Sequence, residues 1–221
     1  MQPSTSQETH AARFREVISN ATFPCLGAKA AIGSREVTYI DLGKIDAEAM
    51  DRLAANLSKF VATKSDPRSS FAVLAAAFGQ VAVSTELEFE KLLWRILQGL
   101  HELDLAPWDC NYSSFPEHGD FKYSFSGRAF YVVGLHPAAS RDARKFSCPT
   151  LVFNPVWQFQ RLRERNQLNQ LIEKIRRRDK QLQGTVNPNL RFEGIRSDAV
   201  QYSGRAVEED WRCPFTPRGE E

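Results

Sequence analysis

The residues best suited to chemistry lie in one polar connection between two apolar runs. Residues 130–135 and 150–153 are rich in aromatic and β-branched side chains, and such runs predict buried strands. The connection between them begins with His136 and continues with the hydroxyl and basic residues Ser140, Arg141, Arg144 and Lys145. An imidazole at the mouth of an apolar strand, with cations a turn or two away, is the arrangement that haem requires for its iron, macrocycle and propionates.

Other interpretations of these residues stay open from spacing alone. A histidine followed by proline also suits an ordinary turn, and basic residues in a connection also suit a solvated surface. Cys25 and Cys213, each beside a proline, are rival ligands for a haem iron. A thiolate ligand donates electron density to iron and favours cleavage of the O–O bond. Cys25 equally suits a buried position as a small apolar side chain.

The elements that would position these residues follow from the spacing of apolar side chains. Helical spacing predicts helices over 9–19, 46–62, 84–103 and 156–182, and apolar or alternating runs predict strands over 37–42, 71–78, 121–125, 129–135 and 150–153. Pro24 and Gly27 predict a tight connection, Asp66-Pro67-Arg68 a break, and Gly184 the end of the last helix. We therefore expect a mixed α/β (α+β) fold, with a central sheet of about five or six strands flanked by helices.

Length and composition indicate one globular domain. The chain has 221 residues, of which 42% are hydrophobic and 25% are charged. We predict a disordered N-terminus over 1–8, a single domain over 9–216 and a short tail over 217–221. The aromatic segment 104–120 is either a lid over a ligand site or a packed surface loop. Short polar-aromatic clusters after residue 187 lead us to expect a C-terminal tail that closes over the haem pocket.

Several classes of protein are disfavoured. A net charge of +2 is too small to indicate nucleic-acid binding, and the basic run 174–180 is typical of a solvated helix face. The first ten residues are polar and no apolar run approaches the length of a membrane span, so we expect a cytoplasmic protein. The four cysteines form no CxxC pair, which argues against a zinc cluster and indicates free thiols. The oligomeric state stays open, a homodimer included.

Several short motifs in a fixed order carry a resemblance to one known family. They are FPC at 23–25, GLHPAASRDARKF at 134–146, LVFNP at 151–155, QFQRLR at 158–163, LQGTVNP at 182–188, QYSGR at 201–205 and WRCPF at 211–215. From Phe23 to Phe215 the chain resembles the YqcI/YcgG family, which includes haem-dependent N-hydroxylases of guanidino groups. One departure is that the family pattern would place a histidine after FNP, where this chain has Val156. His136 is then the one histidine inside a matched motif.

The resemblance implies a cofactor and a reaction. The cofactor would be haem b (iron protoporphyrin IX), with His136 as the axial ligand of the iron. Residues expected to bind the rest of the cofactor are Ser140, Arg141, Arg144, Lys145 and Phe153. The reaction would be N-hydroxylation of a guanidino group, of arginine or a related small guanidine or amine, by dioxygen. No GxGxxG fingerprint indicates a nicotinamide or flavin site, so electrons would come from an external donor. The alternative is a haem-binding sensor or carrier without turnover.

The resemblance also suggests residues for the substrate. Polar residues of the matched motifs are the catalytic candidates, namely Asn154, Gln201, Tyr202 and Arg205. Arg205 would bind the carboxylate of an amino-acid substrate. A guanidinium group needs an acidic partner and an aromatic face, which Glu193, Asp198, Trp108 and Trp211 could supply. Each of these residues also suits a structural role in a turn or in docking of the tail.

Overall fold

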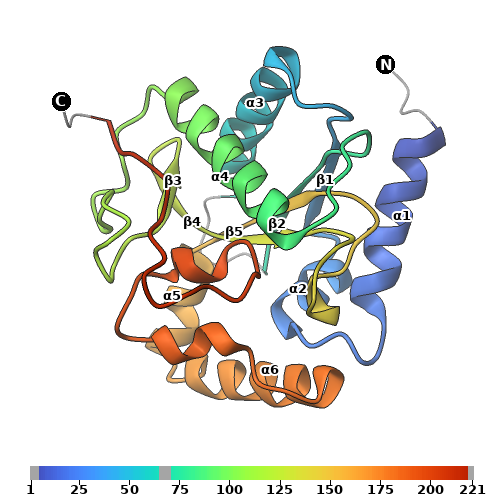
Figure 1. The fold of residues 1–221 in the computed structure, drawn as a ribbon, viewed down its shortest axis with the longest axis vertical. Coiled ribbons are helices and arrows are strands. Elements are labelled where there is room, and N and C mark those ends of the chain that lie inside the picture. The colour runs from blue at the N-terminus through green and yellow to red at the C-terminus, as the bar shows by residue number, and fades with distance from the viewer. Residues whose placement is uncertain (1–4, 65–70, 219–221) are drawn as a thin grey trace.

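Five strands form one mixed sheet in the computed structural model, which describes residues 5–64 and 71–218 (Figure 1). The strands are β1 Val37–Asp41, β2 Val73–Ala77, β3 Tyr123–Phe125, β4 Arg128–Leu135 and β5 Thr150–Pro155. Their order across the sheet is β1-β2-β5-β4-β3, with β1 and β2 parallel and the other neighbours antiparallel. The mixed α/β fold and the size of the sheet predicted from the sequence are therefore confirmed.

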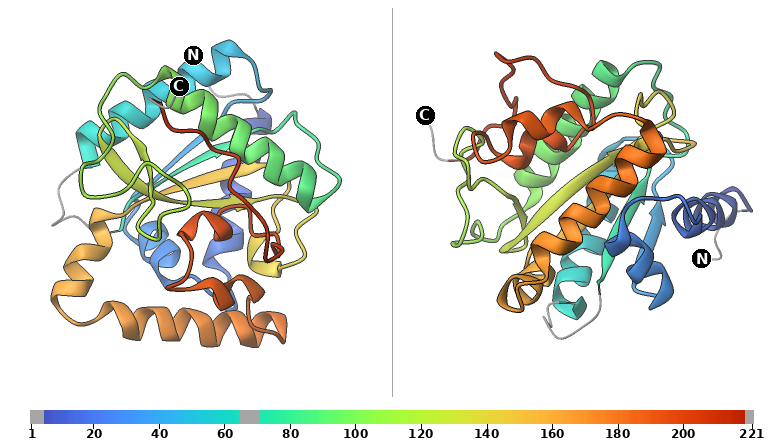
Figure 2. Two further views of the ribbon diagram at one scale, coloured as in Figure 1. Left: turned by 60° about the vertical axis from the view of Figure 1, so that its left-hand side comes forward. Right: turned by 90° about the horizontal axis from the view of Figure 1, so that it is seen from below.

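One face of the sheet, called here the α4 face, is covered by α3 (Ala47–Lys64) and α4 (Glu86–Leu103) (Figures 1 and 2). Helix α4 begins after Thr85, whose hydroxyl accepts the Glu88 backbone N–H at 3.1 Å. Apolar side chains recur along α4 every three or four residues, and Phe89 is fully buried. This stripe packs against the sheet and builds the larger of the hydrophobic clusters in the described residues.

The opposite face, called here the α6 face, lies under α1 (Thr5–Ser19), α2 (Leu26–Gly33), α5 (Trp157–Glu164) and α6 (Leu168–Gln183) (Figure 2). Helices α1 and α2 bury apolar side chains against the β1 and β2 side of the sheet. In contrast, no described residue of α5 or α6 is buried. The α6 face is thus closely packed on one side and incompletely buried on the other.

A glycine in β4 sets how closely α4 approaches the sheet. A Cβ atom at Gly134 would lie 2.4 Å from Cε1 of Phe89, 2.7 Å from Cζ of the same ring and 3.0 Å from Cδ1 of Leu93. Both side chains are fully buried, so neither has space to move. Glycine is therefore required here for packing.

Replacing Gly134 by alanine is expected to lower the free energy of unfolding by about 2 kcal/mol, because overpacking a filled core costs roughly 1–3 kcal/mol. Urea unfolding followed by circular dichroism measures this. Gly33→Ala in α2 is the matched control, since a Cβ there meets nothing within 4 Å. Equal midpoints for the two variants would contradict the packing role of Gly134.

From Tyr202 onward the C-terminal segment packs against α4, while the stretch before it reaches α6, where Glu193 pairs with Arg176. Tyr202 is fully buried, stacks on Trp94 of α4 at 5.7 Å between ring centroids, and donates its hydroxyl hydrogen to the Phe130 carbonyl at 3.2 Å. Phe215 is also buried, and its ring lies 5.8 Å from that of Trp108. The tail therefore completes the core on the α4 face. Segment 104–120 likewise contributes Trp108 to that core, as a packed loop does.

Two elements differ from the sequence prediction. Helix α2 occupies the stretch that Pro24 and Gly27 suggested was a tight connection, because the chain turns at Cys25 and the cysteine caps a helix. The helix predicted over 156–182 is two helices, α5 and α6, separated by Asn166 with a left-handed φ of 55°. Gly184, with φ 77°, ends α6 as predicted.

Some predicted boundaries cannot be placed. Residues 1–4, the Asp66-Pro67-Arg68 break and residues 219–221 lie outside the described residues. Helix α1 begins at Thr5, so the second half of the segment predicted to be disordered is helical. No helix in the described ranges is both long enough and apolar enough to cross a membrane.

Candidate functional site

His136 follows the end of β4 and is enclosed by the protein. Its side chain is turned toward the α4 face, where the imidazole stacks on Phe89 with 4.1 Å between ring centroids and an interplanar angle of 18°. The residue is 1% exposed, and both ring nitrogens are buried without a hydrogen-bond partner in the described protein. A buried polar atom normally has a hydrogen-bond partner. The two ring nitrogens without one make His136 a candidate to bind a metal ion.

Four of the five residues predicted to bind the rest of the haem beside His136 have other partners. Ser140 is exposed and donates to the Glu86 carboxylate, and Lys145 is exposed and pairs with Asp142. Arg141 pairs with Asp179 of α6 at 2.5 Å.

Phe153 lies on the same α4 face as His136 but is fully buried in the large core cluster, against the ring of Phe130. With Arg141 and Lys145 in ion pairs and Phe153 enclosed in the core, the surroundings of His136 as they stand do not fit a macrocycle.

Burial lowers the pKa of His136 to about 4; Glu86 opposes the shift and Arg144 adds to it. The unfolded chain, with an ordinary imidazole near 6.5, then binds more protons than the folded protein between these two values. The free energy of unfolding should therefore fall as the pH is lowered from about 6.5 to about 4. The midpoint of thermal unfolding should depend less on pH in His136→Phe than in wild type across this range. The control His118→Gln, at an exposed position, should keep the pH dependence of wild type. Equal slopes in wild type and His136→Phe would contradict the assignment.

A second group of functional side chains gathers on the α6 face around Cys25. This residue is the N-cap of α2, and its sulfur accepts the Ala28 backbone N–H at 3.4 Å. Burial raises the pKa of the Cys25 thiol, while the N–H groups of Ala28 and Gly27 and the charge of Arg144 act in the opposite direction. Backbone donors and a guanidinium beside the sulfur are the environment that stabilises a thiolate once a metal displaces the proton.

Two half-buried arginines near Cys25 have no carboxylate partner in the described chain. Arg144 donates only to carbonyls, namely those of Gly134 at 3.1 Å, Tyr202 at 3.2 Å and Gln201 at 2.9 Å. Arg178 of α6 donates to the carbonyls of Ala21 and Phe23, just before Cys25, and its Nε is buried without a partner. Because a partly desolvated cation is stabilised by an anion, the two arginines are chemically suited to carboxylate groups from outside the chain.

The sheet contributes polar side chains to the same place. Tyr131 of β4 and Asn154 of β5 are directly paired across the two strands, and strand alternation directs both away from Phe130 and Phe153. The Tyr131 ring also packs edge-on against Tyr202 of the core, with 5.6 Å between ring centroids. Asn154 donates through Nδ2 to the Tyr131 and Val152 carbonyls, which leaves its Oδ1 as an acceptor. Burial raises the pKa of Tyr131, and the nearby charges of Arg144 and Cys25 act on it in opposite directions. We call Cys25, Tyr131, Arg144, Asn154 and Arg178 the Cys25 cluster.

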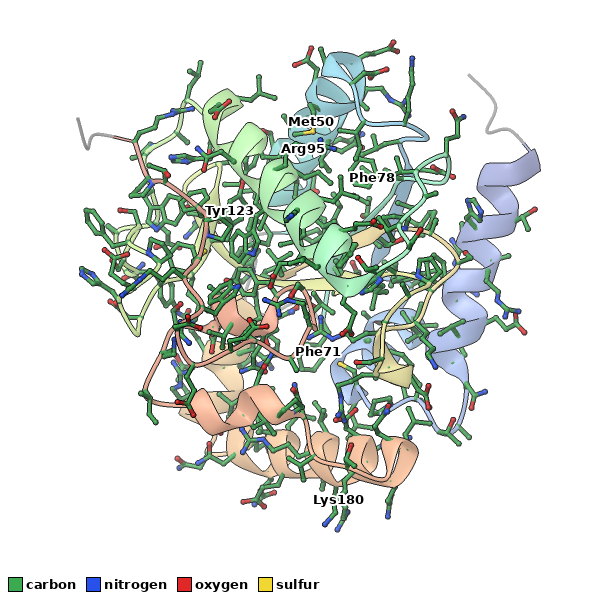
Figure 3. All side chains as sticks on the ribbon, viewed as in Figure 1. Met50, Phe71, Phe78, Arg95, Tyr123 and Lys180 are labelled. Atoms are coloured by element: carbon green, nitrogen blue, oxygen red, sulfur yellow. The ribbon has the colours of Figure 1, made fainter. Side chains whose placement is uncertain are left out.

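Apolar side chains around the Cys25 cluster are left partly exposed. One face of α6 carries leucine and isoleucine at helical spacing, and all of these are only half-buried: Leu168, Leu171, Ile172, Ile175 and Leu182. Phe71, which lies between the sheet and α6, contacts Gly27 beside Cys25 and the ring of Phe159 in α5 (Figure 3). Apolar stripes of amphipathic helices normally bury themselves against a sheet. Here the stripe of α6 faces the sheet without being buried by it.

The Cys25 cluster fits haem better than His136 does. A thiol at a helix N-terminus suits the iron, the unpaired Arg144 and Arg178 suit propionates, and the half-buried apolar stripe of α6 suits a macrocycle. Cys213, the other cysteine considered, packs against the core of the α4 face, and burial raises its pKa to about 12. Of the residues predicted to bind haem, the structure brings Arg144 to this cluster together with the rival ligand Cys25.

The other predicted substrate residues are placed as follows. Asn154 belongs to the Cys25 cluster, and Gln201 adjoins it, because the Gln201 carbonyl accepts from Arg144. Tyr202 lies in the core. Arg205 pairs with Glu90 of α4 at 2.8 Å, which gives it a structural partner in place of a substrate carboxylate.

The predicted partners of a guanidinium are dispersed. Glu193 pairs with Arg176, and Asp198 pairs with Lys122. Trp108 is in the core of the α4 face, and Trp211 packs against the same core. The position after the FNP element, Val156, is buried at the start of α5. None of these acids is thus gathered with a tryptophan to receive a substrate.

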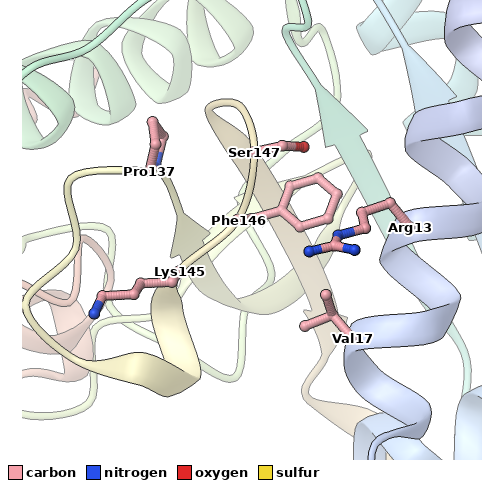
Figure 4. A pocket seen from close by; sticks show the side chains of 6 residues that line it. All are labelled: Arg13, Val17, Pro137, Lys145, Phe146 and Ser147. Atoms are coloured by element: carbon pink, nitrogen blue, oxygen red, sulfur yellow. The ribbon is translucent and has the colours of Figure 1, made fainter.

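One cavity of about 280 Å³ lies between α1 and the connection after His136 (Figure 4). Its lining residues are Arg13, Val17, Pro137, Lys145, Phe146 and Ser147. It is smaller than the roughly 300–1,000 Å³ typical of small-molecule sites. The structure also shows no group of three or more His, Cys, Asp or Glu residues, within its described ranges, that could hold a metal ion.

Arg178 and Tyr131 are members of the Cys25 cluster that their positions in the sequence did not bring forward as candidates. Arg178 lies in a basic run that was interpreted as an outer helix face, although its position falls on the same side of α6 as Leu171 and Ile175. Tyr131 was interpreted only as part of a buried strand. The helical position of Arg178 could have indicated from the sequence that it faces inward. The pairing of Tyr131 with Asn154 could be recognised only once the order of the strands was known.

Comparisons with known proteins agree with the motifs. The chain is 24% identical over 207 residues to the uncharacterized protein YqcI of Bacillus subtilis (strain 168), covering 87% of this chain and 80% of that one. It is also 24% identical over 206 residues to the uncharacterized protein YcgG of the same organism, covering 88% and 81%. No solved structure matches the chain. Since the model of the YqcI/YcgG family matches residues 14–216, the chain belongs to the YqcI/YcgG family.

Proposed function

We propose that this protein is a haem-dependent oxygenase that N-hydroxylates a guanidino group of arginine or a related small guanidine or amine. In this proposal haem b is held at the Cys25 cluster. The observation that carries it is the pair of half-buried arginines, Arg144 and Arg178, which lack carboxylate partners beside a thiol at a helix N-terminus. The reaction itself rests on the resemblance of the sequence motifs to N-hydroxylases.

Three residues of the cluster would hold the cofactor. Cys25 would supply the iron ligand, with the backbone N–H of Ala28 and the start of α2 stabilising the negative sulfur. Arg144 and Arg178 would each bind a propionate, for which the planar guanidinium is well shaped. Bound haem would supply the dioxygen chemistry that amino-acid side chains lack.

The sheet side of the cluster suits the substrate. A guanidinium is planar, donates hydrogen bonds through all of its nitrogens and stacks on aromatic rings. Asn154 Oδ1 offers an acceptor that accepts no hydrogen bond from the described chain, and the half-buried Tyr131 beside it offers a ring. These two residues would therefore orient the nitrogen that is hydroxylated, and the partly buried surroundings would limit access of water.

This proposal differs from the sequence prediction in the choice of iron ligand. His136 stays a rival, because its two ring nitrogens are buried without partners. Cys25 is preferred because its surroundings contain arginines without carboxylate partners and incompletely buried apolar side chains, while the cations Arg141 and Lys145 near His136 are in ion pairs.

The test begins with the purified full chain titrated with hemin and followed by absorbance. A saturable Soret band at one haem per chain is expected. The loaded protein is then given arginine or small guanidines, dioxygen and a chemical reductant, and products are analysed by mass spectrometry for the gain of one oxygen atom. Absence of saturable haem binding would overturn the proposal, and haem binding without product from any guanidine or amine would favour a sensor or carrier.

A further inference from the structure

The outer surface of α5 and α6 has a charge unlike that of the rest of the molecule. Residues 157–183, which span both helices, contain eight lysines and arginines and three aspartates and glutamates, a net charge of +5. Since the whole chain carries +2, the remaining residues together carry −3. The molecule is therefore electrically polarised, with its positive end on these two helices.

The exposed cations on this surface are not neutralised within the described chain. They are Arg163, Arg165, Lys174, Arg177 and Lys180, all exposed and none in an ion pair. We call these five residues the basic face. Exposed Glu164 and Glu173 lie among them, which leaves an excess of positive charge. Paired cations of the same helices, such as Arg176 with Glu193, do not contribute.

The basic face lies directly outside the Cys25 cluster. Arg177 and Arg178 are consecutive in α6, but Arg177 is exposed while Arg178 reaches inward to the Phe23 carbonyl before Cys25. Only the thickness of one helix, roughly 10 Å, separates the outer surface from the cluster. In Figure 2, α6 crosses beneath the sheet as the outermost layer of this side of the molecule.

We propose that the basic face is the docking surface for the electron donor, a small acidic redox protein; this rests on the proposed function. Conversion of an N–H group and dioxygen to an N–OH group and water consumes two electrons and two protons. The chain has no nucleotide-binding fingerprint with which to take these electrons from a bound nicotinamide. An acidic protein carrying one electron at a time would be attracted to the basic face and would reach the nearest surface above the Cys25 cluster.

Other occupants of this surface are less consistent with its charge. A symmetric contact with a second copy would bring two positive faces together, which is repulsive. Nucleic acid would be attracted by the cations, but the interspersed Glu164 and Glu173 and the negative remainder of the molecule oppose its approach. A complementary acidic protein meets neither objection.

The test uses an acidic [2Fe–2S] ferredoxin as probe and isothermal titration calorimetry at increasing salt. Wild-type protein should bind it with an affinity that weakens as salt rises, and the double variant Lys174→Glu/Arg177→Glu should bind about tenfold more weakly at low salt. The control variant Lys91→Glu/Arg95→Glu reverses two exposed cations of α4, on the far side of the sheet, and should bind as wild type does.

Three results would overturn the docking proposal: no ferredoxin binding by wild type, equal weakening in both double variants, or preferential binding of duplex DNA over ferredoxin. Because calorimetry measures association with or without haem, its outcome is separate from that of the haem titration. With haem loaded, stopped-flow reduction by the ferredoxin should slow in Lys174→Glu/Arg177→Glu while reduction by dithionite stays unchanged. Slower reduction by both ferredoxin and dithionite would indicate damage to the haem site and would contradict a role limited to docking.

Discussion

Replacing Cys25 by alanine is expected to weaken hemin binding by about 100-fold or more. Loss of a residue behind a metal ligand typically costs 10–100-fold in affinity, and loss of the ligand itself costs at least as much. The sulfur caps α2 with a weak 3.4 Å contact, so the fold should survive its removal. Equilibrium titration of hemin, followed at the Soret maximum, measures the change in dissociation constant.

Matched cysteine variants separate this effect from a general loss of thiols. Cys110→Ala removes an exposed thiol, and Cys213→Ala removes the rival ligand on the α4 face. Both are expected to bind hemin as wild type does, as is His136→Ala once its folding has been verified by circular dichroism. If Cys25→Ala binds hemin with wild-type affinity and His136→Ala does not, the iron ligand is His136, as the sequence first indicated.

Replacing Glu90 by alanine is expected to lower the free energy of unfolding by about 2 kcal/mol. Glu90 is 5% exposed, accepts from Arg205 at 2.8 Å and from the Ser203 hydroxyl at 3.1 Å, and joins α4 to the C-terminal segment. Removing one partner of a buried ion pair typically costs roughly 3–5 kcal/mol, because the other charge is left desolvated. The lower figure is expected here because Glu208 still pairs with Arg205 at 2.8 Å.

Urea unfolding of Glu90→Ala measures this loss, and Glu102→Ala, an exposed position on the same helix, is the control that should change stability by less than about 0.5 kcal/mol. The family resemblance implies instead that Arg205 binds the carboxylate of a substrate. If Glu90→Ala has unchanged stability and Arg205→Ala binds substrate more weakly, then Arg205 serves the substrate carboxylate and its pair with Glu90 is not needed for the fold.

The sequence predicted the elements whose periodicity is strong. The stripe of α4 and the continuous apolar run of β2 are patterns that tertiary contacts reinforce, so helix and strand appear where predicted. Helix α2 was not predicted because proline and glycine close together, as at Pro24 and Gly27, are typical of a turn. In the structure the proline precedes the helix and the glycine lies inside it, where both are tolerated. The break between α5 and α6 was missed because Asn166 gives little warning of its left-handed conformation.

The candidate site was less predictable than the fold, since its residues come from distant parts of the chain. Cys25 and Arg144 were both selected, but for different reasons, and nothing in their spacing indicated that they would meet. His136 and Arg144 are close in sequence, yet the alternation at the end of β4 turns the imidazole toward Phe89 on the α4 face. The side of the sheet that each residue faces, which a motif does not report, therefore decides which residues act together.

The central claim is that Cys25 provides the iron ligand of a haem bound on the α6 face. The most direct measurement is the absorbance spectrum of the hemin-loaded full chain after reduction and addition of carbon monoxide, since thiolate and imidazole ligation give Soret bands at clearly different wavelengths. We predict the long-wavelength band of a thiolate-ligated carbonyl complex in wild type and in His136→Ala, and its absence in Cys25→Ala. An imidazole-type band in wild type that disappears in His136→Ala would contradict the account.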